Sequence, residues 1–296
     1  MKVLLTGLSG FLGKSLCRQL PDRYQYFAVT RRKHDWGKNI QVLQYDLDDT
    51  SELKDAVQRI RPDICIHLAW EGLPDYGLAV SRKNLITGTE LFRFLVNDCD
   101  CRKIVSAGSC LEYGIDSGSC REDEAVGMGS YFVWAKRALC DFGLTLAREE
   151  KIDFVWLRFF YLYGPGQRES SLIPYLARTL ARGECPEIRT PLNANDFVYI
   201  DDAASAMIPA AFQSVPTGIY NVGSGVSVPV WRICEITERS VSRGTAYYNI
   251  LKNSSSPQNV NFWADTNKSR TTLGWSAEKT LEQGIREYLN QEEFQP

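Results

Sequence analysis

A glycine-rich loop directly follows the first apolar segment of the chain, and it limits the possible folds more than any other feature. Residues 2–6 (KVLLT) are typical of a buried parallel strand, and residues 6–13 (TGLSGFLG) lead from it into a segment of helical periodicity. Gly7 permits a tight turn, Gly10 lets the backbone approach a diphosphate, and Gly13 allows the helix to pack closely on the strand. The N-terminus of that helix offers unpaired N–H groups to phosphate. This arrangement predicts a dinucleotide-binding α/β scaffold.

Segments typical of strands and of helices alternate along the chain as far as Arg158. The predicted strands are residues 2–6, 26–30, 42–45, 64–68, 103–106 and 154–158, and the predicted helices are residues 10–20, 51–60, 84–97 and 131–150. This alternation predicts a Rossmann-type, doubly wound parallel sheet with right-handed crossovers, in which ligands bind beyond the carboxyl ends of the strands.

The alternation ends after residues 164–166 (GPG), which suggests a second structural unit. We expect a dinucleotide-binding domain at residues 1–165, to which residues 195–223 return, and a smaller C-terminal α/β substrate-binding lobe made of residues 166–194 and 224–296.

Composition excludes several classes of protein. The net charge of -2 without a basic block argues against a nucleic-acid partner. No apolar run approaches the roughly 18–20 residues of a membrane span, and the glycine loop follows Met1 too closely for a signal peptide. Nine cysteines in irregular spacing, without a Cys-x-x-Cys pair, and only two histidines predict reduced thiols and no metal site. We therefore expect a cytoplasmic protein.

The end of the second predicted strand bears on the choice of cofactor. An acidic side chain at this position would bind the ribose 2′-hydroxyl of NAD. The chain instead carries Thr30-Arg31-Arg32, and two guanidinium groups suit the 2′-phosphate of NADP. The sequence therefore favours NADP over NAD.

From about Lys2 to Leu289 the chain resembles the extended short-chain dehydrogenase/reductase family, which includes NAD-dependent nucleotide-sugar epimerases, dehydratases and 4-keto reductases. The matching motifs are residues 6–13, 46–47, 66–69, 84, 109–114, 136, 158–165, 196–202, 220–223 and 265–275. With the two arginines, the expected cofactor-binding residues are Thr6, Gly7, Ser9, Gly10, Phe11, Leu12, Gly13, Arg31, Arg32, Asp46, Leu47, Leu68, Ala69 and Lys136.

The resemblance also implies a mechanism. Family members place a Ser or Thr, a Tyr and a Lys beside the nicotinamide, the last two as Tyr-x-x-x-Lys on one helix face. The lysine lowers the pKa of the tyrosine and holds the nicotinamide ribose, and the phenol exchanges a proton with the substrate while hydride is transferred. Ser109 matches the Ser/Thr position and Lys136 matches the lysine.

Phe132 stands four residues before Lys136, where the family pattern has tyrosine, and its side chain has no proton to donate. Four explanations remain open. Tyr131 can replace the phenol only if the helix start is rewound, because an ordinary helix turns it about 100° away. Tyr161, just past a strand, is a second candidate. Water or the substrate itself is a third source, and a deliberate Tyr→Phe change is the fourth explanation.

The residues after Ser109 narrow the reaction. Dehydratases of this family have an Asp-Glu pair there to remove water, whereas this chain has Cys110-Leu111. Glu112 is nearby but shifted by one position, and a helix-capping or surface role suits it as well as an acid–base role. Ketone reduction, or epimerisation through a transient ketone, needs only hydride transfer and one proton donor, so both fit better.

The substrate-binding residues depart from the family pattern too. Family members often bind the nucleotide diphosphate with two arginines, but here Asn195 and the segment 254–256 (SSS) occupy those positions. Residues that can compensate are Arg168, Arg189, Arg232 and Lys252. The predicted substrate-binding set is Tyr161, Arg168, Asn195 and Arg232. The overall layout most resembles 4-keto-6-deoxy sugar reductases of the abequose and paratose synthase kind.

The leading hypothesis is an NADP-dependent oxidoreductase that reduces a keto group of a nucleotide-linked deoxysugar. The alternatives are a nucleotide-sugar epimerase, a reductase of a non-sugar carbonyl, and a catalytically silent NADP-binding protein. Family members commonly form dimers through the helices expected at residues 84–97 and 131–150, so we also expect a homodimer. Apolar residues that suit either this interface or the core are Phe92, Leu95, Leu139 and Phe142.

Overall fold

The computed structural model describes residues 1–37, 39–48, 50–114, 117–124, 127, 129–241, 246–255 and 260–291. Its main body is a seven-stranded sheet in the order β10-β7-β5-β4-β1-β2-β3. The strands are β1 (Lys2–Thr6), β2 (Gln25–Thr30), β3 (Ile40–Gln44), β4 (Ile64–His67), β5 (Lys103–Ser109), β7 (Asp153–Phe159) and β10 (Gly218–Val222). Every neighbouring pair is parallel. The predicted doubly wound, Rossmann-type sheet is confirmed.

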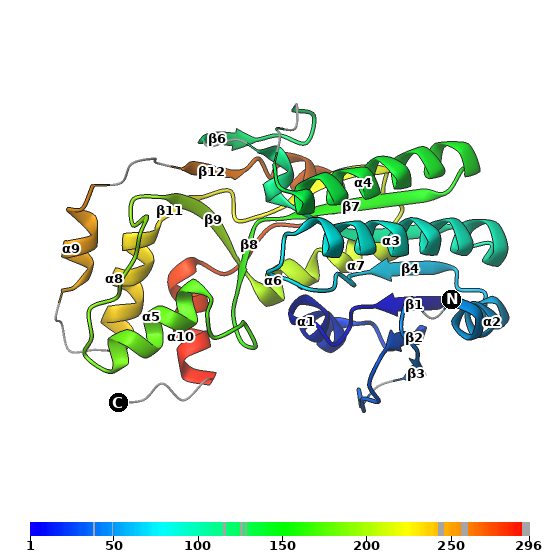
Figure 1. Cartoon of the computed structure of the whole chain (residues 1–296), viewed down its shortest axis with the longest axis horizontal. Coiled ribbons are helices and arrows are strands. Elements are labelled where there is room, and N and C mark those ends of the chain that lie inside the picture. The colour runs from blue at the N-terminus through cyan, green and yellow to red at the C-terminus, as the bar shows by residue number, and fades with distance from the viewer. Residues whose placement is uncertain are drawn as a thin grey trace.

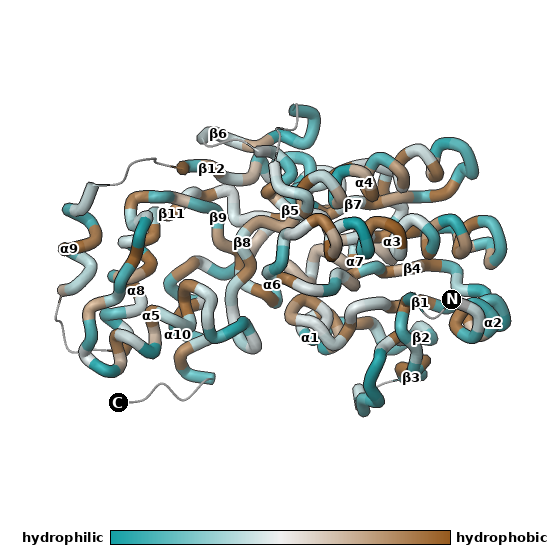
Figure 2. The backbone as a smooth tube through the Cα atoms, viewed as in Figure 1, coloured by the Kyte–Doolittle hydropathy of each residue, from teal (hydrophilic) through white to brown (hydrophobic). Residues whose placement is uncertain are grey.

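Helices cover both faces of this sheet (Figure 1). They are α1 (Phe11–Gln19), α2 (Thr50–Ile60), α3 (Leu78–Cys99), α4 (Tyr131–Glu150), α6 (Ile200–Ser205) and α7 (Met207–Phe212). Alternate residues of β1 point to opposite faces, so Leu5 packs in a core with α1, α6 and α7, while Leu4 packs in a second core with α2, α3 and α4. In Figure 2 the strands β4, β5 and β7 are mostly hydrophobic, as burial on both faces requires.

Helix α3 begins six residues before the start predicted at Asn84. Its first turn has neither an acidic residue nor a side-chain cap on Gly77, so the usual signals of a helix start are missing. The residues proposed for a dimer interface have another role here, since Phe92, Leu95 and Leu139 are buried in the core of the chain itself.

The smaller lobe contains a second sheet in the order β11-β9-β12-β6, with β8 paired to β9. Its strands are β6 (Ser117–Cys120), β8 (Tyr161–Tyr163), β9 (Ala194–Tyr199), β11 (Ser227–Pro229) and β12 (Asn261–Ala264), and its helices are α5 (Leu172–Ala181), α8 (Val230–Val241), α9 (Tyr248–Lys252) and α10 (Leu281–Gln291). The segment 195–223 is divided, because β9 lies in this sheet and β10 in the large one. The domain boundaries given above stay a prediction.

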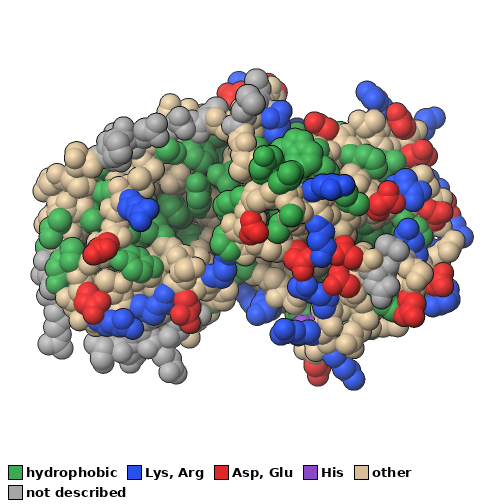
Figure 3. All heavy atoms as spheres, in the orientation of Figure 1, with side chains coloured by type: hydrophobic (Ala, Val, Ile, Leu, Met, Phe, Trp, Pro, Cys, Tyr) green, Lys and Arg blue, Asp and Glu red, His purple; other side chains and the backbone are tan. Residues whose placement is uncertain are grey.

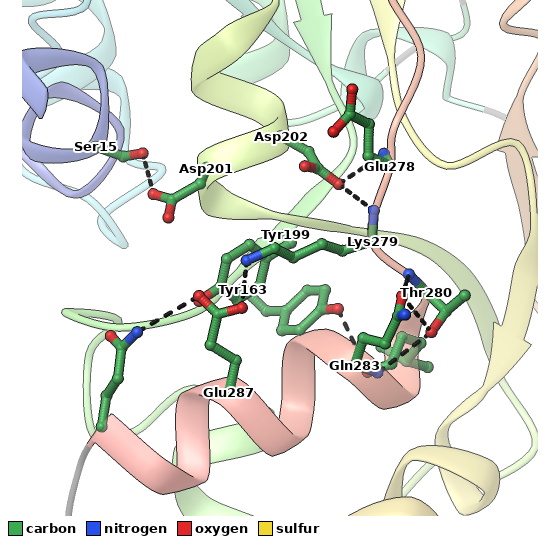
Figure 4. A network of polar contacts seen from close by, with 12 residues as sticks. Ser15, Tyr163, Tyr199, Asp201, Asp202, Glu278, Lys279, Thr280, Gln283 and Glu287 are labelled. Carbon is green, nitrogen blue, oxygen red and sulfur yellow. Dashed lines mark hydrogen bonds and ion pairs between the residues drawn. The ribbon is translucent and has the colours of Figure 1, made fainter. Parts of the chain in front are cut away.

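Helix α6 links the two lobes (Figure 4). The hydroxyl of Ser15 on α1 donates to the carboxylate of Asp201. In the next residue of α6, Oδ2 of Asp202 accepts hydrogen bonds from the backbone N–H groups of Glu278 at 3.0 Å and Lys279 at 2.8 Å. Two adjacent aspartates thus fix the first helix of the large sheet and the segment that leads into α10 to the same short helix.

Three expectations from composition concern the whole chain. All nine cysteines lie within the described residues, where none forms a disulfide; eight are buried and Cys185 is exposed. No group of His, Cys, Asp and Glu in the described part is arranged to hold a metal ion. Among the helices that the structure describes, none has the length and apolar character that crossing a membrane requires.

Candidate active site

The glycine loop lies where the strand order of the large sheet reverses, between β1 and β4. Gly7 has φ +74°, and a Cβ atom there would approach the backbone nitrogen of Ala69 to 2.5 Å. A Cβ atom on Gly13 would collide with the carbonyl oxygen of Gly7. Glycine is therefore required at both positions for the loop, the helix α1 and the segment after β4 to pack together.

Gly10 has a different role from its two neighbours in the motif. It caps α1 with φ −76° and ψ 176°, and no side chain bonds to the first turn of the helix. A Cβ atom on Gly10 would meet only the oxygen of Gly7, at 3.1 Å, among the described residues. Because that side is open and the N–H groups of the first turn are uncapped, the loop fits the diphosphate of a dinucleotide.

A cavity of about 270 Å³ extends from the loop to the carboxyl ends of β2, β3 and β4. Ligand pockets typically measure about 300–1,000 Å³, so this cavity has room for part of a dinucleotide. The predicted cofactor residues that line it are Gly7, Ser9, Gly10, Arg31, Asp46, Leu47, Leu68 and Ala69. The predicted residues outside the lining, as far as the structure describes it, are Thr6, Phe11, Leu12, Gly13, Arg32 and Lys136.

His67 lines this cavity and is bonded to Thr6 behind it. The Thr6 hydroxyl lies 2.8 Å from Nδ1 of His67, and it accepts a hydrogen bond from the backbone N–H of Ala69 at 3.4 Å. Burial, together with the charge of Lys136, lowers the pKa of His67 to about 3. His67 is therefore neutral at physiological pH and holds the end of β4 in place.

Charged side chains surround the other end of the cavity. Nη1 of Arg31 lies 2.6 Å from Glu71, and Nζ of Lys83 lies 2.7 Å from Glu71 and 2.6 Å from Asp48. Hydrogen bonds to these carboxylates raise the pKa of Lys83. Arg32 is exposed. An additional phosphate at the end of β2 would therefore compete with Glu71 for Arg31.

Lys136 is buried next to the cavity. Its ammonium group donates to the carbonyl of Ala107 at 2.7 Å and lies 3.9 Å from the centre of the Trp70 ring. Burial lowers the pKa of Lys136 to about 7, although the carboxylate of Glu112 opposes this shift. Trp70 also lines the cavity, so this residue contacts both the cavity and the ammonium group.

Phe132 is buried in an aromatic cluster. Its ring centre lies 5.3 Å from that of Trp70 and 5.1 Å from that of Tyr76. Tyr131, one residue earlier, is 54% exposed and lines a surface hollow with Trp134. Helix α4 begins without rewinding, and the phenol of Tyr131 faces away from the side on which Phe132 and Lys136 are buried.

Glu112 is fully buried. Its carboxylate accepts the backbone N–H of Ser109 at 2.7 Å, the indole N–H of Trp156 at 3.1 Å and Nε of Arg158 at 2.9 Å. The hydroxyl of Ser109 in turn accepts the N–H of Leu111, which completes a capping box. The expectation of a capping role is confirmed and the surface alternative is wrong. In the sequence, the charged residue Arg158 inside an otherwise apolar strand was the signal for its buried ion pair with Glu112.

Tyr161 and Asn195 lie close together in the smaller lobe. The Tyr161 ring packs 5.6 Å from Phe197 and 6.1 Å from Phe262, and burial, with smaller contributions from Cys110 and Tyr76, raises its pKa. Asn195 shares a face of β9 with Phe197, two residues on. Its Oδ1 atom is buried and has no hydrogen-bond partner among the described residues. This face thus has an unsatisfied acceptor beside aromatic rings.

The two predicted substrate arginines lie elsewhere. Arg168 is exposed in the segment between β8 and α5. Arg232 on α8 forms ion pairs with Glu235 and with Glu282 of α10. It lines a groove between these two helices, and neither Asn195 nor Tyr161 belongs to the described lining of that groove.

Comparison with known proteins identifies the family. The model of the "NAD dependent epimerase/dehydratase family" matches residues 3–223. The chain belongs to this family. The extended short-chain dehydrogenase/reductase resemblance noted in the sequence is thereby confirmed, and this family member has a glycine loop, Ser109 and Lys136 at the carboxyl edge of its large sheet, with phenylalanine at position 132.

Relatives of this family member catalyse different reactions. A UDP-glucuronate 4-epimerase of Thermodesulfobacterium geofontis is 26% identical over 97% of this chain and 94% of that protein. A CDP-abequose synthase of Salmonella typhimurium is 26% identical over 97% of each chain. The solved structure of MoeE5 in complex with UDP-glucuronic acid and NAD superposes with a TM-score of 0.83, at 26% identity and 98% coverage of both chains.

Proposed function

We propose that this member of the epimerase/dehydratase family is an NADP-dependent oxidoreductase that reduces a keto group of a nucleotide-linked deoxysugar. The observation that carries the proposal is the position of Glu112. Its carboxylate is fully buried and paired with Arg158, so it is not free to act as an acid or base on a substrate. Without the Asp-Glu pair that removal of water needs, reduction or epimerisation is the chemistry left to Ser109 and Lys136.

The cofactor proposal rests on the loop and on the end of β2. A bound nicotinamide dinucleotide supplies or accepts hydride. The uncapped N–H groups of α1 bind its diphosphate, and Arg31 and Arg32 bind the 2′-phosphate of NADP once Arg31 leaves Glu71. The complex of MoeE5 contains NAD, which favours the other dinucleotide. Calorimetry with NADP⁺ and NAD⁺ decides between them, and tighter binding of NAD⁺ would overturn this part of the proposal.

The side chains of the site have distinct parts in the proposed reaction. Ser109 is half-buried at the end of β5, where its hydroxyl can bind the oxygen of a substrate carbonyl. Lys136 holds the nicotinamide ribose, and at a pKa of about 7 it can exchange protons at neutral pH. The unsatisfied Oδ1 of Asn195 and the aromatic rings of Tyr161 and Phe197 provide a surface for the sugar nucleotide.

The proposed function is tested with NADPH and a panel of 4-keto-6-deoxy sugars linked to CDP, dTDP, UDP and GDP. We expect one NADPH to be oxidised for each sugar reduced. The similarity to CDP-abequose synthase makes the CDP-linked sugar the first to test. Binding of NADPH without turnover of any sugar would overturn the proposal in favour of a silent binding protein, and turnover of simple ketones alone would favour a non-sugar reductase.

Epimerisation is the second candidate, because a UDP-glucuronate 4-epimerase is equally similar over the whole chain. An epimerase returns the hydride to the sugar, so it inverts a stereocentre without net change in the cofactor. Incubation with UDP-glucuronic acid and catalytic NAD⁺, followed by analysis of the sugar, tests this directly. Formation of the epimer with no change in absorbance of the reduced cofactor would replace the reductase proposal.

We also propose that the protein forms a homodimer through α3 and α4. Large apolar side chains are exposed on these helices at Leu78, Ile86, Tyr131 and Trp134. Hydrophobic side chains gather over the N-terminal ends of the two helices (Figure 3). Light scattering coupled to gel filtration tests the proposal, and Trp134→Glu is expected to shift a dimer towards monomer. A monomeric wild-type protein would contradict it.

A further inference from the structure

The reaction proposed above needs a proton donor, and the residue at position 132 does not provide one. Reduction of a ketone adds hydride to the carbonyl carbon and a proton to the carbonyl oxygen. A bound NADPH supplies the hydride. Phe132 has no exchangeable proton, so the proton comes from another source, and a side chain beside Lys136 and Phe132 is the source that the structure can locate.

One phenol outside α4 contacts the ring of Phe132. Tyr76 lies in the loop between β4 and α3, and its ring centre is 5.1 Å from that of Phe132 at an angle of 55°. The same loop begins with Ala69 and Trp70, which line the dinucleotide cavity. Tyr76 therefore reaches the aromatic cluster around Lys136 from a segment that already belongs to the site.

The hydroxyl of Tyr76 is not committed to any other contact in the described structure. Buried tyrosines of this chain are bonded internally, as Tyr113 is to Asn221 at 2.7 Å and Tyr220 is to Pro216 at 2.7 Å. Among the described residues Tyr76 has ring contacts but no hydrogen bond. In the single chain its side chain is 42% exposed and lines a surface hollow together with Tyr131 and Trp134, so water in this hollow can return a proton to it after each turnover.

The other two candidate phenols are less well placed. Tyr131 on α4 is 54% exposed and has no ring contact with Phe132 among the described residues. Tyr161 is held between Phe197 and Phe262 on the smaller lobe, where it interacts electrostatically with Tyr76. Tyr161 thus lies near Tyr76 but has no contact with Phe132 or Lys136 in the described structure.

We propose that Tyr76 is the catalytic acid of this enzyme, because its phenol contacts the ring of Phe132 from the β4–α3 loop. The inference rests on the proposed function. As hydride reaches the carbonyl carbon, the electron pair of the C=O π bond moves to oxygen. That oxygen takes the proton of the Tyr76 hydroxyl, the O–H bond breaks, and the phenolate formed is reprotonated by solvent.

The first test compares single and double variants in NADPH-dependent reduction of the keto sugar that the wild type turns over. Tyr76→Phe is expected to lower kcat about 100-fold or more, as loss of a general acid does. Phe132→Tyr, added to Tyr76→Phe, is expected to restore kcat to within about tenfold of the wild type. The matched control is Tyr24→Phe, which removes a hydroxyl from a ring stacked on Phe212 and is expected to leave kcat unchanged.

The second test needs no turnover. Tyrosine labelled with ¹³C at Cζ gives one NMR signal for each residue, and the signal of Tyr76 is identified by its loss in Tyr76→Phe. Saturation with NADP⁺ is expected to shift this signal, because Trp70 lines the cavity and its ring contacts Phe132, which contacts Tyr76. The signal of Tyr24 is expected to stay in place.

The outcomes separate the two proposals. Wild-type kcat in Tyr76→Phe, or a Tyr76 signal unaffected by bound NADP⁺, would overturn the role of Tyr76 and leave the proposed function intact. Loss of activity in Tyr131→Phe or Tyr161→Phe with full activity in Tyr76→Phe would assign the acid elsewhere. A wild type that reduces no sugar of the panel would overturn the proposed function and the inference together.

Discussion

The ammonium nitrogen of Lys136 lies 3.9 Å from the centre of the Trp70 ring. A cation over the face of an indole is stabilised by about 0.5–2 kcal/mol, with the higher values at desolvated sites. The other partners of this buried charge are the carbonyl of Ala107 and, at 5.9 Å and 5.7 Å, the rings of Phe132 and Trp156. The same ring lines the dinucleotide cavity. Trp70 therefore contacts both the dinucleotide cavity and the ammonium group of Lys136.

Replacement of Trp70 by Leu is expected to lower the pKa of Lys136 further below 7, because the charged form loses its nearest aromatic partner while the apolar surroundings remain. NMR titration of the lysine side-chain nitrogen measures this value. Trp134→Leu is the control, since Trp134 is exposed on the same helix as Lys136. An unchanged pKa in Trp70→Leu would show that the ring does not stabilise the ammonium group.

Lys136→Met is expected to stabilise the protein most at acidic and neutral pH. Burial lowers the folded-state pKa from the ordinary value of 10.5 to about 7, so between these values the unfolded chain binds more protons and stability rises with pH. Below pH 7 the penalty for burying the charge is fully present, and above pH 10.5 it is absent. Urea unfolding at pH 6 and pH 10 measures the difference. An equal gain at both pH values would contradict this assignment.

Local features predicted the glycine loop and the large sheet, because these features act between neighbours in the sequence. Gly7 and Gly10 follow directly from the tight turn between β1 and α1, and the parallel sheet follows from the alternation of apolar strands and helices. The smaller sheet was not predicted. Its strand β6 has the sequence SGSC, which lacks the apolar and β-branched residues by which strands are recognised.

The contacts around the reacting groups could not be predicted for a different reason. Trp70 meets Lys136, and Tyr76 meets Phe132, only because the β4–α3 loop folds over the start of α4. Such pairs are far apart in the sequence and leave no periodic pattern. The absence of tyrosine at position 132 was visible, but the phenol beside it became visible only in three dimensions.

Gly10→Ala is expected to abolish dinucleotide binding while leaving the fold intact. The backbone of Gly10 is extended, a conformation open to any residue, and an added Cβ atom would meet only the oxygen of Gly7, at 3.1 Å, among the described residues, so a small shift accommodates it while the methyl group blocks close approach of a diphosphate. Gly13→Ala is the contrasting variant, because its Cβ atom would collide with backbone atoms of Gly7 and Leu8. We expect normal thermal unfolding but no calorimetric NADP⁺ signal for Gly10→Ala, and a lower Tm for Gly13→Ala. Normal binding by Gly10→Ala would exclude this loop as the phosphate site.

Acid is expected to destabilise the protein through His67. Its folded-state pKa of about 3 lies below the ordinary 6.5, so the unfolded chain takes up a proton first as the pH falls. Stability is therefore lost progressively from pH 6.5 towards pH 3. Replacement by Asn, which can still pair with the Thr6 hydroxyl, is expected to flatten this part of the curve. Urea unfolding of both proteins at pH 7 and pH 4.5 measures the effect, and parallel loss in both would rule out His67 as its source.

Arg158→Met is expected to destabilise the fold by about 3–5 kcal/mol, as removal of one partner from a buried ion pair does. Arg158 and Glu112 are 4% and 0% exposed, so water cannot replace the lost guanidinium around the carboxylate. The N–H groups of Ser109 and Trp156 still donate to Glu112 and limit the loss. The double variant Glu112→Gln/Arg158→Met removes both charges, and we expect it to recover most of the stability. Urea unfolding at pH 7 measures all three proteins. If the double variant were less stable than Arg158→Met, the isolated charge of Glu112 would not be the cause of the loss.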